Sequence, residues 1–188
     1  MGRVLDLDPA AMPPDQHRLY EEIKGPRAGF GGPFALWIRL PKIADLANRF
    51  GNALRLEGKL DRGLFELMIL AIARYWGAQY EWYVHESAAR KNGIADALIF
   101  AIRDGLPPVY ARDEERVIVE LTRELQATRT VSQATYDRAL AAFGLDVLIE
   151  IITVAGFYTT AAMMINTFQS NVPGAAQPLP SLTAEAAR

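Results

Sequence analysis

The sequence predicts an all-α protein in which helices pack around one core. Apolar residues recur at helical spacing along most of the 188 positions, and no segment shows the strict alternation of a half-buried strand. Helix-starting and helix-stopping residues bracket these segments. Hydrophobic residues make up 51% of the chain, which is enough to build a buried core. We therefore expect a helical bundle.

The N-terminal part is interrupted by proline and glycine. A first helix is expected over residues 15–24, directly after a pair of prolines. Residues 25–33 form a Gly/Pro loop whose glycine spacing does not match the phosphate-binding GxGxxG pattern, so we interpret it as a linker. A short apolar segment, 34–39, follows. Pro41 then suits the first turn of a helix that runs to about residue 56.

Two central helices are expected next, over residues 61–77 and 80–91. Asp61 is a suitable N-cap for the first of them. Over residues 64–73 this helix is apolar on nearly every side, and Glu66 is its single charge. A helix that is apolar all round is a buried one, so we expect it in the core.

The C-terminal half continues the helical pattern. Asp113 and Ser132 are suitable N-caps, and Gly144 is a suitable stop. The tail beyond residue 173 is rich in Ala and Pro and is expected to be loosely ordered. Further helices are expected over residues 96–103, 113–126, 132–143 and 146–170.

The stretch 151–168 carries no formal charge and is close to the minimum length of a membrane span. Polar residues such as Thr159 and Asn166 interrupt it, and no basic flank anchors it. We interpret this stretch as a buried central helix of the bundle, and no membrane partner is expected.

Composition excludes several kinds of function. The formal net charge of −2 provides no basic excess for a phosphate backbone, so no nucleic-acid partner is expected. The chain has no cysteine, which excludes disulfides, thiolate nucleophiles, zinc–thiolate sites and iron–sulfur clusters. Because the N-terminal residues show no export signal and disulfides are excluded, a cytoplasmic location is expected.

Glu81 and His85 are the strongest candidates for chemistry. They lie four positions apart, which places both side chains on one helix face within contact range. A carboxylate beside an imidazole fixes the tautomer of the ring and suits it to general acid/base catalysis near neutral pH. The same spacing also describes an ordinary polar pair on a solvated face, and the sequence leaves both interpretations open.

Glu66 is the third candidate, because a lone carboxylate in an apolar helix needs a partner or an upward-shifted pKa. The alternative for Glu66 is a helix-capping or solvent-facing residue. If the helices 61–77 and 80–91 form an antiparallel hairpin, Glu66 can face the second helix. The spacing alone does not decide whether it reaches His85.

A metal site made of Glu66, Glu81 and His85 is an alternative. The run that starts at His85 lacks the second histidine of the HExxH motif, and His17 is the only other imidazole in the chain. We therefore expect no metal, and the metal-dependent enzyme is kept as a rival interpretation.

Aromatic and basic residues around this pair are candidates for substrate binding. For Trp82 and Tyr80, packing in the core is the first interpretation, and a place in the wall of a pocket is the second. Arg90 and Arg74 are candidate anchors for a substrate carboxylate, against the more common role of arginine as a surface residue.

At these residues the sequence resembles the carboxymuconolactone decarboxylase family, which includes the alkylhydroperoxidase D proteins. The specific part of the resemblance is the spacing of Glu66, Glu81 and His85. The resemblance implies an all-helical bundle of the alkylhydroperoxidase D-like type, built around a helix hairpin and assembled into homo-oligomers. The segments that carry it are 64–67, 80–85 and 88–94, together with 32–36, Pro41, 154–158 and 166–168, which resemble a longer branch of the family.

The resemblance implies one activity and excludes another. The hydroperoxidase branch has a Cys-x-x-Cys motif at the positions that correspond to Ala78 and Glu81, so thiol peroxidase activity is excluded here. The decarboxylase branch has a glutamate and a histidine four apart, as Glu81 and His85 are, and acts on γ-carboxymuconolactone in aromatic catabolism. This similarity implies acid/base chemistry that needs no cofactor.

The expected organisation is an N-terminal helix and loop (1–31), a carboxymuconolactone decarboxylase-like helical domain (32–170) and a flexible tail (171–188). We expect a cofactor-free lyase or isomerase that acts on a small carboxylated, lactone-like molecule, in a dimer, trimer or hexamer. The alternatives are a non-enzymatic homo-oligomeric protein that binds a small molecule, and a metal-dependent enzyme. The expected roles are proton transfer by His85, orientation of His85 by Glu81, support of the pair by Glu66, and substrate binding by Trp82, Tyr80 and Arg90.

Overall fold

A computed structural model describes residues 2–25 and 30–181 of the chain. Within these residues the regular elements are all helical and no strand is present, which confirms the predicted all-α fold. The shorter elements are the 3-10 turns η1 (Pro9–Ala11) and η3 (Pro173–Ala175) and the π-helical turn η2 (Ala53–Glu57). The α-helices are α1 (Pro14–Lys24), α2 (Pro33–Trp37), α3 (Pro41–Asn52), α4 (Arg62–Trp76), α5 (Gln79–Lys91), α6 (Asp96–Asp104), α7 (Asp113–Thr128) and α8 (Gln133–Phe168).

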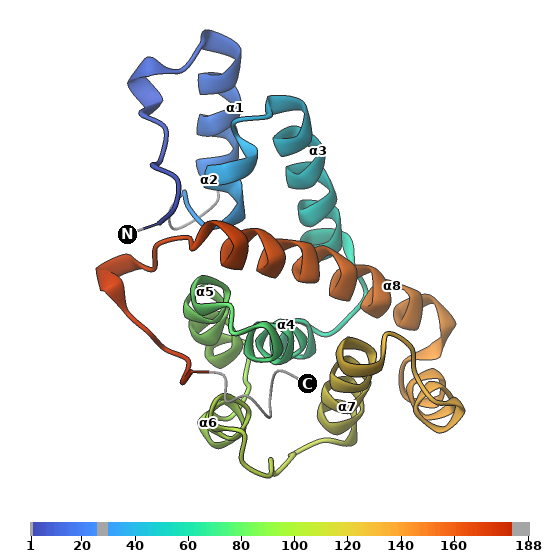
Figure 1. Ribbon diagram of the computed structural model, residues 1–188. Coiled ribbons are helices and arrows are strands. Elements are labelled where there is room, and N and C mark those ends of the chain that lie inside the picture. The colour runs from blue at the N-terminus through green and yellow to red at the C-terminus, as the bar shows by residue number, and fades with distance from the viewer. Residues whose placement is uncertain (1, 26–29, 182–188) are drawn as a thin grey trace.

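The long helix α8 separates two groups of helices, as Figure 1 shows. The N-terminal helices α1, α2 and α3 lie on one side of it, and α4, α5, α6 and α7 lie on the other. Both groups contact α8, since α2 packs against it from one side and α4, α5 and α7 pack against it from the other. Any cavity that touches both groups must therefore lie along α8.

Helix α4 is the centre of the main core. Every residue from Gly63 to Ala73 is buried, as predicted from its nearly continuous apolar sequence. It packs against α5, α6, α7 and α8, which cover it on several sides. A second, smaller apolar cluster joins the N-terminal helices to α8, and its buried members are Ile23, Trp37, Ile38, Ala44 and Ala161.

Most expected helix ends are found within one or two residues. Asp61 caps α4 through a hydrogen bond that Leu64 N donates to its Oδ1, 3.1 Å. Gly77 ends α4 in the left-handed region, at φ 62°, where glycine carries no steric cost. The cap of α7 was predicted one residue too late. Helix α7 starts after Arg112, and the Glu115 carboxylate reaches back to accept from the Arg112 N–H, 3.4 Å.

Helix α8 differs from the expectation in two ways. The two helices expected over 132–143 and 146–170 run on as one element with a kink at Gly144, which has φ 73° and ψ 167°. The expectation of a buried helix was also wrong for much of its surface, because only 22% of its most apolar stretch is buried. Its outward side chains include Leu145, Ile149, Ile152 and Met163.

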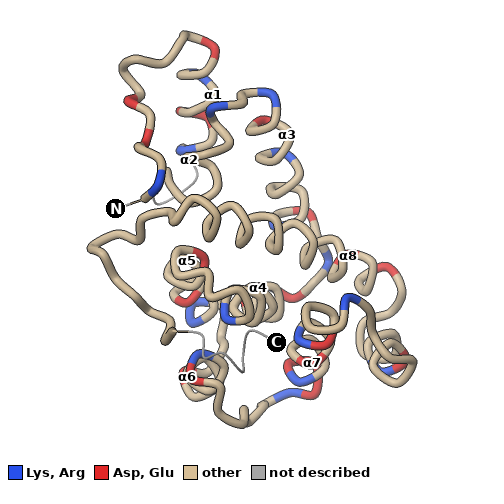
Figure 2. The backbone as a smooth tube through the Cα atoms, viewed as in Figure 1, with Lys and Arg blue, Asp and Glu red and all other residues tan. Residues whose placement is uncertain are grey.

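By length and composition, α8 could cross a membrane, and it is the one helix in the described part of the chain of which this is true. Figure 2 shows no charged residue along its C-terminal half. A single helix of this kind is weak evidence, because the core helix of a water-soluble protein has the same length and composition.

The C-terminal tail is more ordered than expected as far as residue 181. Leu179 is buried in the main core. Its backbone N–H and C=O are both hydrogen-bonded to the Gln79 side chain, each at 2.9 Å. The rest of the expected flexible tail, residues 182–188, lies outside the described residues, as do residues 26–29 of the expected linker.

Candidate active site

The site is built on the hairpin of α4 and α5. Because Gly77 turns the chain sharply after α4, α5 starts two residues later and runs back along α4. In this antiparallel arrangement Glu66 of α4 faces α5. The two helices are in extensive contact along their length.

Glu66 and His85 meet across this hairpin. Glu66 Oε2 lies 2.6 Å from His85 Nδ1, and the Glu66 side chain is 1% exposed. With Glu66 ionised, Nδ1 carries the proton and donates to the carboxylate, which leaves Nε2 as the basic nitrogen. His85 is the partly exposed member of the pair, with 14% of its side chain open to solvent.

Glu66 is kept charged by its neighbours. Burial alone raises its pKa, but the hydrogen bond and charge of His85, with the charges of Arg62 and Arg55, give a net lowered pKa. Arg62 lies one turn earlier on α4 and donates from Nη2 to Glu66 Oε1. It also donates from Nη1 to the Arg55 carbonyl, 3.1 Å, so it ties the hairpin to the π-helical turn.

Glu81 has the opposite electrostatic environment. It is 3% exposed, and its Oε2 is buried without a hydrogen-bond partner among the described residues. Burial raises the pKa of Glu81 well above its usual range, which favours the protonated, uncharged form of its carboxyl group. The site thus holds one ionised and one protonated carboxyl group on adjacent helices.

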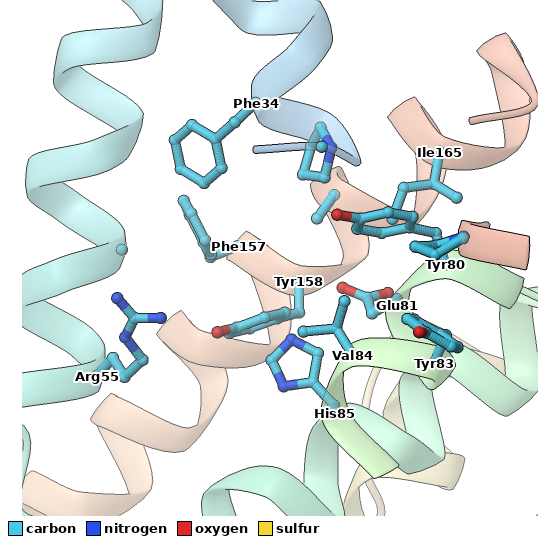
Figure 3. A pocket seen from close by; sticks show the side chains of 15 residues that line it. Phe34, Arg55, Tyr80, Glu81, Tyr83, Val84, His85, Phe157, Tyr158 and Ile165 are labelled. Atoms are coloured by element: carbon cyan, nitrogen blue, oxygen red, sulfur yellow. The ribbon is translucent and has the colours of Figure 1, made fainter. Parts of the chain in front are cut away.

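Glu81 and His85 both line one cavity of about 580 Å³, shown in Figure 3, while Glu66 lies behind His85. This volume suits a small organic molecule. The cavity lies along α8 between α5 and the N-terminal group of helices, which explains why residues far apart in sequence contribute to it. Its lining includes Phe34, Arg55, Tyr80, Glu81, Tyr83, Val84, His85, Phe157, Tyr158 and Ile165.

Tyr80 forms one wall of the cavity because two glycines make room for it. A Cβ atom on Gly31 or Gly32 would collide with the Tyr80 ring. Gly32 also has φ 56°, a conformation that favours glycine. These two glycines of the expected linker therefore shape the cavity as well as connecting helices.

Tyr158 projects from α8 into the cavity. Its ring stands perpendicular to that of His85, with ring centroids 5.2 Å apart. Burial, followed by the charge of Glu66, raises the pKa of Tyr158 above its ordinary value, so its hydroxyl stays protonated and can donate. Figure 3 shows this hydroxyl on the side of the cavity where Arg55 lies.

The structure corrects the expected pairing within the site. Glu66, and not Glu81, is the carboxylate hydrogen-bonded to His85. Glu81 shares the α5 face and the cavity with His85, but the described residues include no hydrogen bond between these two side chains. The reason is that the hairpin presents the α4 carboxylate to Nδ1 from the facing helix.

The substrate-binding residues also need correction. Tyr80 lines the cavity, which agrees with its interpretation as the wall of a pocket. Trp82 is fully buried in the main core, and Arg90 lies on the surface, where it pairs with Glu86 and Asp96. Neither Trp82 nor Arg90 lines the cavity, and the same is true of Arg74.

Sequence reasoning missed Arg55, Arg62 and Tyr158. Arg62 had a usable signal, since it precedes Glu66 by one helical turn in an otherwise apolar helix. Arg55 and Tyr158 come from the π-helical turn and from α8, so only the tertiary fold brings them to the hairpin.

No group of three or more His, Asp or Glu side chains in residues 2–25 and 30–181 is arranged to hold a metal ion. Glu66 points at the imidazole, while Glu81 has a buried, unpaired oxygen, so the three candidate ligands do not converge. The geometry gives the metal-dependent alternative no support.

Comparison with known families agrees with this geometry. The model of the carboxymuconolactone decarboxylase family matches residues 41–124, which include α3 to most of α7 and hence Glu66, Glu81 and His85. Tyr158 and the cavity wall from α8 lie outside the matched segment.

Solved structures show the same fold in distant sequences. An uncharacterised peroxidase-related protein from Ralstonia eutropha JMP134, with an alkylhydroperoxidase AhpD core, has a TM-score of 0.75 at 16% identity, over 96% of this chain and 98% of that one. A peroxidase-related protein from Silicibacter sp. TM1040 has a TM-score of 0.72 at 17% identity, over 93% and 94%. The debrominase Bmp8, solved as a cysteine-to-alanine variant with 2,3,4-tribromopyrrole, has a TM-score of 0.72 at 10% identity, over 86% and 87%.

No curated protein sequence matches this chain significantly. The structural likeness therefore establishes the alkylhydroperoxidase D-like fold, and the chemistry must be argued from the site itself. The chain has no cysteine, so a cysteine-dependent peroxidase reaction has no nucleophile here.

Proposed function

We propose that this protein is a cofactor-free acid/base enzyme, a lyase or isomerase that acts on a small carboxylated, lactone-like molecule. The observation that carries the proposal is that His85 and Glu81 line one cavity but have opposite electrostatic environments. His85 is backed by the ionised Glu66, while Glu81 is held neutral by burial, and both His85 and Glu81 line the same space. Titratable groups whose environments push their protonation states apart are typical of acid/base sites.

The proposed roles follow from these protonation states. Nε2 of His85 accepts a proton from the substrate, and Glu66 stabilises the imidazolium that forms. The Glu81 carboxyl group donates its proton to the carbon or oxygen where negative charge develops. Burial then favours the return of a proton to Glu81, because the ionised form is poorly solvated there.

The shape of the cavity supports a small, flat substrate. Its walls are largely aromatic and aliphatic, with few polar groups, which is the usual composition of a small-molecule site. The debrominase of similar fold is in complex with a small planar heterocycle, 2,3,4-tribromopyrrole, and this is consistent with a flat ligand.

We also propose that the protein is a homo-oligomer and that it works in the cytoplasm. The exposed apolar side chains of α8 support the first part, since a stripe of this kind on a surface helix is typical of a contact between proteins.

The direct test is a panel of unsaturated carboxy-lactones assayed with the wild type and with His85→Ala. We expect turnover of at least one compound by the wild type and a loss of about 10²- to 10⁴-fold in the variant. Ser87→Ala is the matched control, because Ser87 is an exposed residue of the same helix that does not line the cavity. Equal turnover by wild type and His85→Ala would exclude the mechanism.

The same panel distinguishes the proposed enzyme from the alternative of a non-enzymatic binding protein. Such a protein would bind compounds from the panel without converting them, and His85→Ala would not change this outcome. The cavity next to His85 already argues against a purely structural role, because an imidazole buried in a subunit contact would have no such space beside it.

A further inference from the structure

Arg55 is a cation of the cavity that the proposed acid/base chemistry does not use. It lies on the π-helical turn η2, it is half-buried, and its guanidinium group reaches the cavity wall. Among the described residues no carboxylate lies within 4.0 Å of this guanidinium group, whereas the neighbouring Arg62 is paired with Glu66. Arg55 is therefore available to a ligand.

The π-helical turn holds Arg55 in place from several directions. Arg55 Nη2 donates to Asn52 Oδ1, 3.1 Å, and the Arg55 carbonyl accepts from Arg62. Just after the turn, the Glu150 carboxylate of α8 accepts from the backbone N–H groups of Lys59, 2.8 Å, and Leu60, 3.2 Å. Glu150 thus fixes the turn to the helix that carries Tyr158. Local π-helical geometry of this kind is common at functional sites.

Tyr158 supplies a second donor at the same end of the cavity. Its hydroxyl lies toward Arg55 in Figure 3. Burial raises the pKa of Tyr158, and the nearby Arg55 charge acts in the opposite direction. A guanidinium group and a phenol hydroxyl together match the oxygens of a carboxylate.

The remaining ionisable groups limit the charge that a ligand can carry. Arg55 is the one lysine or arginine among the described lining residues, so it is the permanent cation of the cavity. At the other end of the cavity lie the buried Glu81 carboxyl and the apolar side chains of Val84 and Ile165. A second anionic group there would meet no cation and would be poorly solvated.

We propose that Arg55 and Tyr158 form an anion subsite, and that the cavity therefore selects a ligand with one carboxylate on a flat apolar body over neutral molecules and over dicarboxylates. This inference rests on the proposed function, because it assigns the substrate's orientation in the same cavity. The carboxylate sits between Arg55 and Tyr158, and the apolar body extends toward Glu81 and His85.

The test measures binding, so it is independent of turnover. Benzoate, benzamide and isophthalate serve as probes with one, no and two carboxylate groups, and isothermal titration calorimetry gives their dissociation constants. We expect the wild type to bind benzoate at least 10-fold more tightly than benzamide or isophthalate. We expect Arg55→Gln to weaken benzoate binding about 10-fold or more and to leave benzamide binding unchanged.

Further variants separate the subsite from general damage. Arg55→Lys keeps the charge and should restore part of the affinity for benzoate, and Tyr158→Phe should weaken benzoate binding a few-fold. Arg90→Gln is the matched control, since Arg90 is a surface arginine outside the cavity and its loss should change nothing. Circular dichroism confirms that each variant is folded.

The outcomes distinguish this inference from the proposed function. If the wild type binds benzoate and Arg55→Gln binds it more weakly, but the wild type turns over no lactone of the panel, the subsite stands and the proposed enzyme fails. The subsite is overturned if Arg55→Gln binds benzoate as the wild type does, if isophthalate binds as tightly as benzoate, or if the wild type binds none of the probes at millimolar concentration.

Discussion

His85 Nδ1 and Glu66 Oε2 lie 2.6 Å apart across the α4–α5 hairpin, although 19 positions separate the two residues in sequence. This contact fixes both the orientation of the imidazole and the nitrogen that carries its proton. It also makes the register of the hairpin part of the chemistry, because a shift of α5 along α4 would separate the carboxylate from the ring.

Glu66→Gln should reduce stability as well as remove the carboxylate partner of His85. The substitution leaves Arg62 without its ion pair in a largely buried setting, and we expect a loss of about 2–3 kcal/mol in the free energy of unfolding. Urea unfolding followed by circular dichroism measures it. Glu86→Gln, which breaks a helix pair with the exposed Arg90, should cost less than about 1 kcal/mol. Equal losses in the two variants would contradict the assignment.

The acid stability of the protein should depend on Glu66. Its pKa is lowered in the folded state relative to the ordinary 4.5, so the unfolded chain binds the extra proton. The stabilisation is therefore present above pH 4.5 and is lost as the pH falls through the folded-state pKa. Acid unfolding curves should be steeper for the wild type than for Glu66→Gln over this range, and identical slopes would argue against an ionised Glu66.

Glu81→Gln should show the opposite dependence on pH. The folded-state pKa of Glu81 is raised well above 4.5, so its contribution is fully present below pH 4.5 and is lost as the pH rises through the folded-state value. A neutral glutamine avoids this loss. We expect the melting temperature of Glu81→Gln, relative to that of the wild type, to increase as the pH is raised from 4.5 to 8. A difference that is constant with pH would show that Glu81 is not held neutral.

Gly32→Ala should disturb the cavity through Tyr80. A Cβ atom at this position adds the strain of a positive φ, about 1 kcal/mol, and pushes the Tyr80 ring from its place. Gly93→Ala is the matched control, because Gly93 has φ 86° but open space around it. Both variants should lose stability, but only Gly32→Ala should also lose affinity for a cavity ligand such as benzoate. Equal affinities in the two variants would show that Tyr80 does not depend on Gly32.

The exposed stripe on α8 should hold copies of this chain together. Ile152→Glu places a charge in the middle of the stripe and should shift the mass measured by light scattering toward the 20.8 kDa of one chain. Leu106→Glu is the control, because Leu106 is similarly exposed but lies outside α8. A wild type that is already monomeric would contradict the proposed oligomer.

The sequence predicts local features of this fold well. The N-cap Asp61, the stop at Gly77 and the apolar run of α4 are set by interactions within a few residues, so spacing and residue type are sufficient. The presence of Glu66 in a buried helix was also visible, since a carboxylate in such a run must find a partner.

The parts that the sequence did not predict depend on tertiary structure. The i, i+4 spacing favoured Glu81 as the partner of His85. In the structure, Glu66 on the facing helix is hydrogen-bonded to His85 Nδ1 instead. Arg55 reaches the cavity from the π-helical turn and Tyr158 from α8, and no local pattern connects them. The exposure of α8 was missed because an apolar helix that is buried and one with an uncovered apolar face have similar sequences.

The central claim is that Glu66 holds the proton on Nδ1 of His85 and leaves Nε2 as the base. The ¹⁵N chemical shifts of the ring nitrogens, measured at a pH where the imidazole is neutral, test it without any substrate. The structure predicts a protonated Nδ1 and an unprotonated Nε2 in the wild type, with this preference reduced in Glu66→Gln. A wild-type ring with its proton on Nε2 and a bare Nδ1 would contradict the account.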